Sequence, residues 1–369
     1  MALIKDIYTL NFFKELAVNL QQVLPAFDKT TFIDNIYANG FEEKEWKGRM
    51  QHVTEVLHQF MPVSYAEAVI LLEKLILQLK TAGFGEDKLE FMFLPDYIAT
   101  YGLDDFPASV YALERTTQFV SAEFAVRPFL IKYGVPMMDQ MQEWSVHPNH
   151  KVRRFASEGT RPRLPWATAV PLLKQQPQLT LPILENLKHD PSLWVRKSVA
   201  NHLNDIAKTH PAIVLDIARK WKGISKETDA LVKHGCRTLL KQGNPEVLQL
   251  HGFDSTQVLL DNFVVNTPHV KGGESLSFTF SIKNNADKAQ VIRLEYAVYY
   301  RRLRGDFSKK VFKISEKVYA PNEKVSVQRK QSFKPITTRK FYVGEHKVAV
   351  IVNGEEKAAG VFELLLPNQ

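Results

Sequence analysis

The 369-residue sequence has almost no cysteine and no long apolar run. Its single cysteine, Cys236, cannot form an internal disulfide, as is usual for proteins of a reducing compartment. The most apolar stretch, AEAVILLEKLILQLK, is interrupted by Glu67, Glu73 and Lys74 and falls short of the ~20 apolar residues that a membrane span needs. The N-terminal segment mixes charges with apolar residues, unlike a signal peptide. We therefore expect a soluble, cytoplasmic protein.

The motifs of several common catalytic sites are also missing. The chain has no HExxH zinc motif, no GxxxxGK[ST] phosphate loop, no GxGxxG and no GxSxG. His147 and His150 lie where a helix is expected to begin, and polar residues at that place favour a loop end over a metal site. Cys236 lies in an apolar segment, which is typical of a core thiol. The sequence therefore gives no sign of zinc, nucleotide or acyl chemistry.

Positive charge is unevenly distributed along the chain. A net charge of +8 and a pI near 9.2 favour a polyanionic partner without distinguishing DNA, RNA and acidic membranes. Residues 254–369 contain 19 Lys and Arg against 12 Asp and Glu, and so supply +7 of the net charge. Residues 1–253 are nearly balanced, with 29 against 28. The two parts are expected to have different electrostatic roles.

Hydrophobic periodicity changes once. Up to about residue 250, apolar residues recur at helical spacing between short Pro, Gly or Asn breaks. After Gly252 the pattern alternates with a period of two, and Asn353-Gly354 between two such runs indicates a two-residue hairpin turn. About seven strands in ~110 residues fit an immunoglobulin-like β-sandwich. Because one core rarely supports a chain of this length, we predict a helical domain at 1–252 and a β-sandwich domain at 253–369.

The helical part contains a repeat. HPNHKVRRFASE (147–158) is echoed by HDPSLWVRKSVANH (189–202), with Arg153 and Arg196 43 residues apart, and a weaker copy, KHGCRTLLKQG, places Arg237 41 residues further on. Periods of ~40–47 residues with two helices per unit are typical of HEAT and armadillo solenoids. In the two stronger copies we expect the proline to start a helix, the valine to enter the core and the arginine to lie on the inner face.

The segment HPNHKVRRFASEGTRPRLPWA, followed one repeat later by LWVRKSVANHLNDIAKTHP, resembles the AlkC family of bacterial DNA alkylation-repair glycosylases, and more distantly their AlkD relatives. The similarity covers essentially the whole chain, including FVSAEFAVRPFL and the C-terminal sandwich of one AlkC subgroup. It implies hydrolysis of the N-glycosidic bond of cationic bases, such as 3-methyladenine and 3-methylcytosine, without metal or diffusible cofactor. The implied partner is double-stranded DNA with alkylated bases. We expect a monomer that associates with the nucleoid and not with a membrane.

The hydrolysis that the resemblance implies calls for carboxylates in the active site. A base that already carries positive charge needs no protonation, so the enzyme has to stabilise an oxocarbenium-like sugar and orient a water molecule. Glu158 lies six residues after Val152 in the first copy, the equivalent residue in the second is Asn201, and Asp205 lies one helical turn further on the same face. Glu158 and Asp205 should therefore point from adjacent helices into one groove. Glu123, in the preceding helix pair, would complete a row of three catalytic acids.

The resemblance matches these three acids to acidic positions around the lesion, and Trp166 to an aromatic residue near the exposed sugar. Trp166 could instead be a core anchor beside Pro165, whereas a cation–π contact would suit a cationic base or sugar. Without the resemblance, the three acids would be indistinguishable from solvated helix residues.

Basic residues gather in two places. We expect Arg161 and Arg163 to contact DNA phosphates, because no acid lies between Glu158 and Glu185. The remaining cations of the repeat motif could bind phosphates or form interhelix salt bridges: Arg153, Arg154, Arg196 and Lys197. In the predicted sandwich, YYRRLRGDFSKK could be a DNA clamp or a solubilising run, and it contains Arg301, Arg302, Arg304, Lys309 and Lys310.

Two functions of other classes stay open. One is a non-catalytic HEAT scaffold that binds a protein or undamaged DNA, because this fold supports many functions. The other is an RNA-binding module that uses the basic sandwich. Base release from methylated DNA distinguishes a glycosylase from a scaffold, and competition between duplex DNA and single-stranded RNA tests the second alternative.

Overall fold

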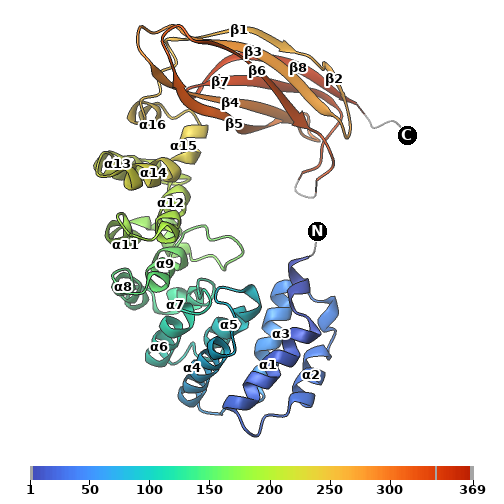
Figure 1. The fold of residues 1–369 in the computed structure, drawn as a ribbon, viewed down its shortest axis with the longest axis vertical. Coiled ribbons are helices and arrows are strands. Elements are labelled where there is room, and N and C mark those ends of the chain that lie inside the picture. Colours follow the sequence, from blue (N-terminus) through green and yellow to red (C-terminus); the bar gives the residue numbers. More distant parts are fainter. Residues whose placement is uncertain (1–2, 337–338, 366–369) are drawn as a thin grey trace. The chain divides into compact units, whose positions relative to one another are not determined.

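The computed structural model describes residues 3–336 and 339–365, with helices up to residue 250 and strands from residue 258 (Figure 1). The helices are α1 (Leu10–Val23), α2 (Lys29–Tyr37), α3 (Trp46–His58), α4 (Tyr65–Thr81), α5 (Phe93–Tyr101), α6 (Phe106–Thr117), α7 (Val126–Tyr133), α8 (Val135–Trp144), α9 (His150–Gly159), α10 (Pro171–Gln175), α11 (Leu181–Leu187), α12 (Leu193–Ala207), α13 (Pro211–Trp221), α14 (Lys226–Gly235), α15 (Arg237–Lys241) and α16 (Pro245–Leu250). Short 3-10 turns are η1 (Ile4–Ile7), η2 (Phe41–Glu43), η3 (Leu89–Met92) and η4 (Pro177–Thr180). In this described part, no helix is long and apolar enough to cross a membrane.

The strands are β1 (Val258–Val265), β2 (His269–Lys271), β3 (Ser275–Asn284), β4 (Gln290–Arg301), β5 (Phe307–Tyr319), β6 (Lys324–Ser332), β7 (Gly344–Val352) and β8 (Glu355–Leu365). They form a three-stranded sheet in the order β1-β3-β6 and a five-stranded sheet in the order β2-β8-β7-β4-β5. All pairings are antiparallel except that of β2 with β8. The predicted order, a helical half followed by a β-sandwich, is confirmed.

Contacts divide the chain into two compact units, but not at residue 252. One unit runs to His210 and resumes from Trp221 to Gly235, and the other contains Pro211–Lys220 and the chain from Cys236 onward. Helices α15 and α16 therefore group with the strands, as does α13 apart from its last residue. That residues 1–252 act as a separable catalytic domain stays a prediction.

The two stronger repeat copies begin their helices at equivalent residues. The side chain of Asn149 caps α9 by accepting from the backbone N–H of Lys151, whereas Ser192, at the same place before α12, makes no side-chain cap hydrogen bond. The proline of each copy lies just before this cap, and so outside the helix that it was expected to start. Val152 and Val195 are fully buried, as predicted.

The arginine of each copy closes the loop before its helix. Arg153 Nη1 donates to the carbonyl oxygens of residues 147 and 148, and Arg196 Nη1 donates to those of residues 190 and 191. In both copies the acceptors are the residues six and five positions earlier. Arg153 also pairs with Asp190, at 2.5 Å from Nε to Oδ2, which links the two copies. Both guanidinium groups are therefore engaged by backbone carbonyls that need donors, and their expected position on the inner face stays a prediction.

The first unit is built by stacking these helices in chain order (Figure 1). Helix α12 packs against α9 on one side and α14 on the other. Gly235, at the end of α14, permits this approach, because a Cβ there would lie 3.0 Å from that of Leu203. The weakest repeat copy forms no regular third unit, since Cys236 separates α14 from the five-residue α15.

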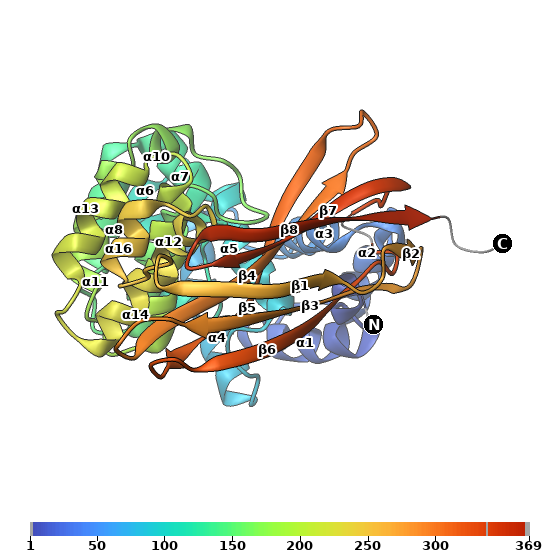
Figure 2. The same cartoon turned by 90° about the horizontal axis from the view of Figure 1, so that it is seen from above.

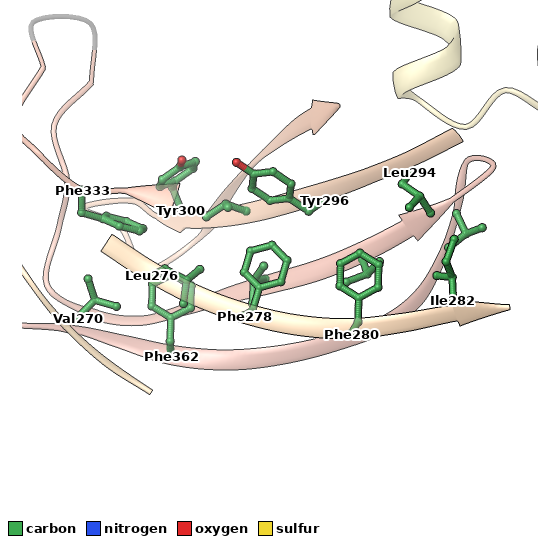
Figure 3. Packing of buried hydrophobic residues seen from close by; sticks show 14 of the residues in the cluster. Val270, Leu276, Phe278, Phe280, Ile282, Leu294, Tyr296, Tyr300, Phe333 and Phe362 are labelled. Atoms are coloured by element: carbon green, nitrogen blue, oxygen red, sulfur yellow. The ribbon is translucent and has the colours of Figure 1, made fainter. Parts of the chain in front are cut away.

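The second unit has its core between the two sheets, which lie face to face in Figures 1 and 2. Alternate residues of β3 point into this core, as the period-two pattern predicts, and Phe278 and Phe280 are almost fully buried. Figure 3 shows the Phe278 ring facing Tyr296 of β4, and the centroids of these two rings are 5.3 Å apart. Aromatic packing therefore joins the sheets without the disulfide of antibody domains.

The predicted hairpin turn joins β7 to β8. Asn353 and Gly354 both have positive φ, at 48° and 83°, as a type I′ turn requires. Asn353 also accepts a hydrogen bond from the Arg293 backbone and donates one to the Asp254 carbonyl. A Cβ on Gly354 would lie only 2.4 Å from Leu248 of α16, so this turn and that helix are in close contact.

Replacing Gly354 with alanine should destabilise the second unit through both strain and overlap. Gly305→Ala is the control, because Gly305 has φ +87° with open space around it, and its cost should be about 1 kcal/mol. Gly354→Ala should cost about 2–4 kcal/mol, since the overlap adds to the strain. Urea unfolding followed by circular dichroism measures both. Equal costs would show that the end of the Leu248 side chain moves aside without cost.

Candidate active site

Acidic and basic side chains alternate along one row in the first unit. Arg154 Nη1 donates to Glu123 Oε2 at 2.7 Å, and its Nη2 lies 3.9 Å from Glu158 Oε1. Arg161 Nη1 donates to the same Glu158 oxygen at 2.5 Å, and its Nε and Nη2 both lie 2.9 Å from Asp205 Oδ2. The order is Glu123, Arg154, Glu158, Arg161, Asp205. The structure therefore brings the three predicted acids together, with an arginine between each pair.

Stacking of α9 on α12 sets this row. Glu158 lies in the last turn of α9 and Asp205 in α12, while Glu123 lies in the turn between α6 and α7. Ser198 of α12 donates its hydroxyl to Glu158 Oε2 at 2.6 Å, which fixes the carboxylate from the neighbouring repeat. The solenoid period thus places side chains about 40 residues apart in the sequence within hydrogen-bond distance.

Arg161 compensates two buried carboxylates. Glu158 is 6% exposed and Asp205 1%, and buried charges are costly unless they are paired. Burial disfavours the charged guanidinium, but Glu158 and Asp205 outweigh it and raise the pKa of Arg161. Arg161 is itself 8% exposed. This geometry does not favour the predicted phosphate contact of Arg161, because its donors already bind carboxylates.

A cavity of about 380 Å³ opens beside this row. Its aromatic lining is Trp46, Phe124, Trp166 and Trp194, and its charged lining is Asp87, Glu123, Arg154, Glu158 and Arg161. Asp205 is not among the lining residues, because it lies behind Arg161. Two of the three predicted acids therefore face the cavity directly, and the third is connected to it through a guanidinium group.

Trp166 stands at the edge of the cavity in a strained conformation. It is 63% exposed, which excludes the role of core anchor, and its φ is +64°. Such a conformation is uncommon for a bulky residue and persists only where neighbours hold it. The ring of Trp46 lies 5.9 Å away, and the ammonium of Lys47 donates to the Trp166 carbonyl. The first turn of α3 thus supports the predicted sugar-contacting residue.

Sequence reasoning missed four of the aromatic and charged residues that line the cavity: Trp46, Asp87, Phe124 and Trp194. Trp194 lies in the repeat motif, and its ring packs under the Arg154 guanidinium at 4.4 Å. The dipeptide Trp194-Val195 was the available signal, because it departs from the Lys151-Val152 of the first copy. Trp46 and Asp87 belong to distant helices and loops, and no local pattern marks them.

The other predicted cations differ in accessibility. Arg163 and Lys197 are exposed, and among the described residues no hydrogen bond or ion pair occupies the Arg163 side chain. In the second unit Arg302 pairs with Asp306 at 2.8 Å, and Lys309 with Glu356 at 2.6 Å. Arg301 is half-buried, whereas Arg304 and Lys310 are exposed. Charges therefore stay available for anion binding in both units.

Neither a metal ion nor a reactive thiol is indicated by the described residues. Across the described residues, 3–336 and 339–365, no group of three or more His, Cys, Asp or Glu side chains is placed to hold a metal ion. Cys236 is buried, and burial raises the pKa of its thiol to about 12, which keeps it protonated and unreactive.

A neutral histidine links α12 to α9, the two helices that carry Asp205 and Glu158. His202 of α12 is fully buried, and its Nδ1 lies 3.0 Å from the Ser157 carbonyl oxygen. Burial lowers the pKa of His202 to about 3, and the nearby Arg161 and Arg127 act in the same direction. The imidazole therefore stays neutral and hydrogen-bonds α12 to α9 without adding charge.

Comparisons with known proteins agree in both parts of the chain. A family model described as "DNA alkylation repair enzyme" matches residues 116–231, and one described as "Uncharacterised protein YhaZ, C-terminal Ig-like domain" matches residues 259–366. The chain is 42% identical to "Uncharacterized protein YhaZ" of Bacillus subtilis (strain 168) over 365 residues, covering 99% of this chain and 100% of that protein.

A solved structure matches over the same extent. The "Pseudomonas fluorescens alkylpurine DNA glycosylase AlkC bound to DNA containing an abasic site analog" is 37% identical, with 99% of this chain and 100% of that chain covered and a TM-score of 0.91. The fold and the matches define a class of DNA alkylation-repair proteins in which helices precede an immunoglobulin-like domain. The chain belongs to the AlkC family, in the subgroup with the C-terminal immunoglobulin-like domain. The resemblance carried by the repeat motif is confirmed.

The low pKa of His202 predicts a loss of stability in acid. Below pH ~6.5 the unfolded chain takes up a proton that the folded chain rejects, so each pH unit lowers the free energy of unfolding by about 1.4 kcal/mol until about pH 3. In His202→Asn, which keeps a donor near Nδ1, the fall between pH 7 and pH 5 should be about 2 kcal/mol smaller than in the wild type.

Urea unfolding followed by tryptophan fluorescence measures this difference, because all five tryptophans belong to the first unit. Equal pH dependence in the two proteins would mean that His202 becomes protonated in the folded state.

Proposed function

We propose that this protein is a DNA glycosylase that hydrolyses the N-glycosidic bond of cationic alkylated bases in double-stranded DNA. The observation that carries the proposal is the cavity in which Glu123 and Glu158 lie beside exposed Trp166. Membership of the AlkC family supports it, since the matched solved structure is that of an alkylpurine DNA glycosylase bound to DNA with an abasic site analog. As substrates we propose 3-methyladenine and 3-methylcytosine.

The proposed reaction requires mainly that the protein hold negatively charged groups beside the sugar. The bond between the sugar C1′ and the base breaks with both electrons going to the base, which leaves neutral because it began as a cation. Positive charge develops on the sugar, where the carboxylates of Glu123 and Glu158 would stabilise it. A water molecule attacks C1′ and loses its proton to a carboxylate or to solvent. The products are the free base and an abasic site.

The arginines between the acids have a defined part in this scheme. Three neighbouring carboxylates repel one another, and the two that are buried, Glu158 and Asp205, are costly unless they are paired. Arg154 and Arg161 supply the paired positive charge. We assign Asp205 a positioning role, because it reaches the cavity only through Arg161. Glu123 and Glu158 are the proposed catalytic residues.

Affinity for the duplex would come from cations outside the row. Arg163 and Lys197 are exposed in the first unit, and Arg304 is exposed in the second. The second part of the chain supplies +7 of the net charge, which suits a phosphate-binding clamp, since phosphate contacts dominate affinity for DNA. We propose that the protein binds as a monomer and that Arg153 and Arg196, occupied by backbone carbonyls, do not contribute.

The test is base release from methylated duplex DNA. Glu158→Gln and Asp205→Asn should each lower the single-turnover rate at saturating protein at least 100-fold and leave affinity for undamaged duplex within threefold. Glu158→Gln removes a charge that acts on the transition state, and Asp205→Asn loosens Arg161. The matched control is Asp190→Asn, because Asp190 is a buried acid paired with Arg153 outside the cavity.

Asp190→Asn should lower stability without changing the saturating rate. A wild-type protein that binds DNA but releases no base would be a scaffold. Wild-type rates in Glu158→Gln would remove that residue from the site.

A further inference from the structure

Arg127 of α7 is a buried cation without a carboxylate partner among the described residues. It is 1% exposed. Its Nε donates to the Thr168 carbonyl at 2.8 Å, and its Nη1 donates to the carbonyls of Gly159 and Arg161 at 2.9 and 2.7 Å. A guanidinium group presents five N–H donors in a rigid plane, so it can hold several carbonyls in a fixed mutual arrangement.

All three acceptors belong to one segment, residues 159–168, which leaves the end of α9. This segment carries two residues of the site: Arg161, between the buried carboxylates, and Trp166, at the edge of the cavity. It is held from the other side by Lys47, which donates to the carbonyl of Trp166. The shape of the segment therefore depends on two cations from outside it.

Arg127 is an unfavourable residue on grounds of stability alone. Burial, together with the charge of nearby Arg161, lowers the pKa of Arg127 to about 10, so the folded protein bears an electrostatic penalty to keep it charged. Well-packed apolar residues are often as stable as buried charges or more so. The chain nevertheless keeps a guanidinium under the segment that carries Arg161 and Trp166.

We propose that Arg127 is a positioning residue of the active site. It fixes residues 159–168 so that Arg161 stays between Glu158 and Asp205 and Trp166 stays at the cavity. The expected effect of Arg127 on the reaction rate rests on the proposed glycosylase function. Its expected effect on residues 159–168 rests on the hydrogen bonds alone.

The chain offers a matched control in Arg49 of α3. Arg49 is also buried, and its guanidinium donates to three backbone carbonyls, those of Lys44, Lys5 and Glu42, at 2.7–3.0 Å. These acceptors lie outside the cavity. Replacing Arg49 removes the same kind and number of hydrogen bonds as replacing Arg127. The Arg49 variant therefore measures the effect on stability of losing such bonds away from the cavity.

The experiment compares Arg127→Met, Arg127→Lys and Arg49→Met in the full chain. Amide hydrogen exchange of the peptide that covers residues 159–168 measures the segment, and single-turnover release of 3-methyladenine at saturating protein measures the site. In Arg127→Met, exchange in this peptide should rise at least tenfold and the rate should fall at least 30-fold, with less than a threefold change in affinity for undamaged duplex. Arg127→Lys keeps the charge but cannot span three carbonyls, and should give intermediate values.

A double-mutant comparison separates positioning from general damage. If Arg127 acts through the segment, Arg127→Met should lower the rate less in a Trp166→Ala protein than in the wild type, because residues that act through one another are not additive. Arg49→Met should change neither the exchange of this peptide nor the saturating rate, although it lowers the melting temperature.

Unchanged exchange of residues 159–168 in Arg127→Met would overturn the proposal, as would equal rate losses in Arg127→Met and Arg49→Met. If Arg127→Met does not fold, Arg127→Lys decides by the same two measurements. A wild-type protein that releases no base would refute the proposed function, and the exchange measurement would still decide whether Arg127 holds the segment.

Discussion

The structure of the site depends on pairing two carboxylates that are buried in adjacent repeats. Arg161 meets this constraint, because one guanidinium group binds both Glu158 and Asp205. Other features follow from the need to hold that guanidinium in place. Stacking of α9 on α12 brings the acids within its reach, Ser198 orients Glu158, and Arg127 fixes the backbone of Arg161. The cavity owes its charge to this arrangement and its apolar walls to tryptophans from three separate segments.

The same constraint accounts for the uneven distribution of charge. In the first unit many cations bind acids or backbone carbonyls and are unavailable to a ligand, as Arg153, Arg154 and Arg161 show. A nearly neutral catalytic part can then carry carboxylates for a cationic transition state without being strongly attractive to a polyanion. The excess of positive charge lies in residues 254–369, where we propose that it attracts DNA without disturbing the acids.

Periodicity was sufficient to predict the order of helices and strands, the Asn353-Gly354 turn and the burial of Val152 and Val195, because each depends on neighbours in the sequence. The repeat period also placed Glu158 and Asp205 on facing helices. The same local reasoning missed the carboxylate partners of Arg161. It found no acid in the following loop, whereas the partners lie three residues earlier and 44 residues later. Trp46 and Asp87 approach the cavity through long-range packing, which one sequence does not encode in any local pattern.

The most direct test of the central claim, that this row of acids recognises a developing sugar cation, is the affinity for two abasic-site analogs in the same duplex. One is a cationic aza-sugar and the other a neutral tetrahydrofuran. The wild type should bind the cationic analog at least 100-fold more tightly, and Glu158→Gln should lose most of that preference while its affinity for the neutral analog changes little. Equal affinities of the wild type for the two analogs would contradict the account, because carboxylates poised for a cation must distinguish charge.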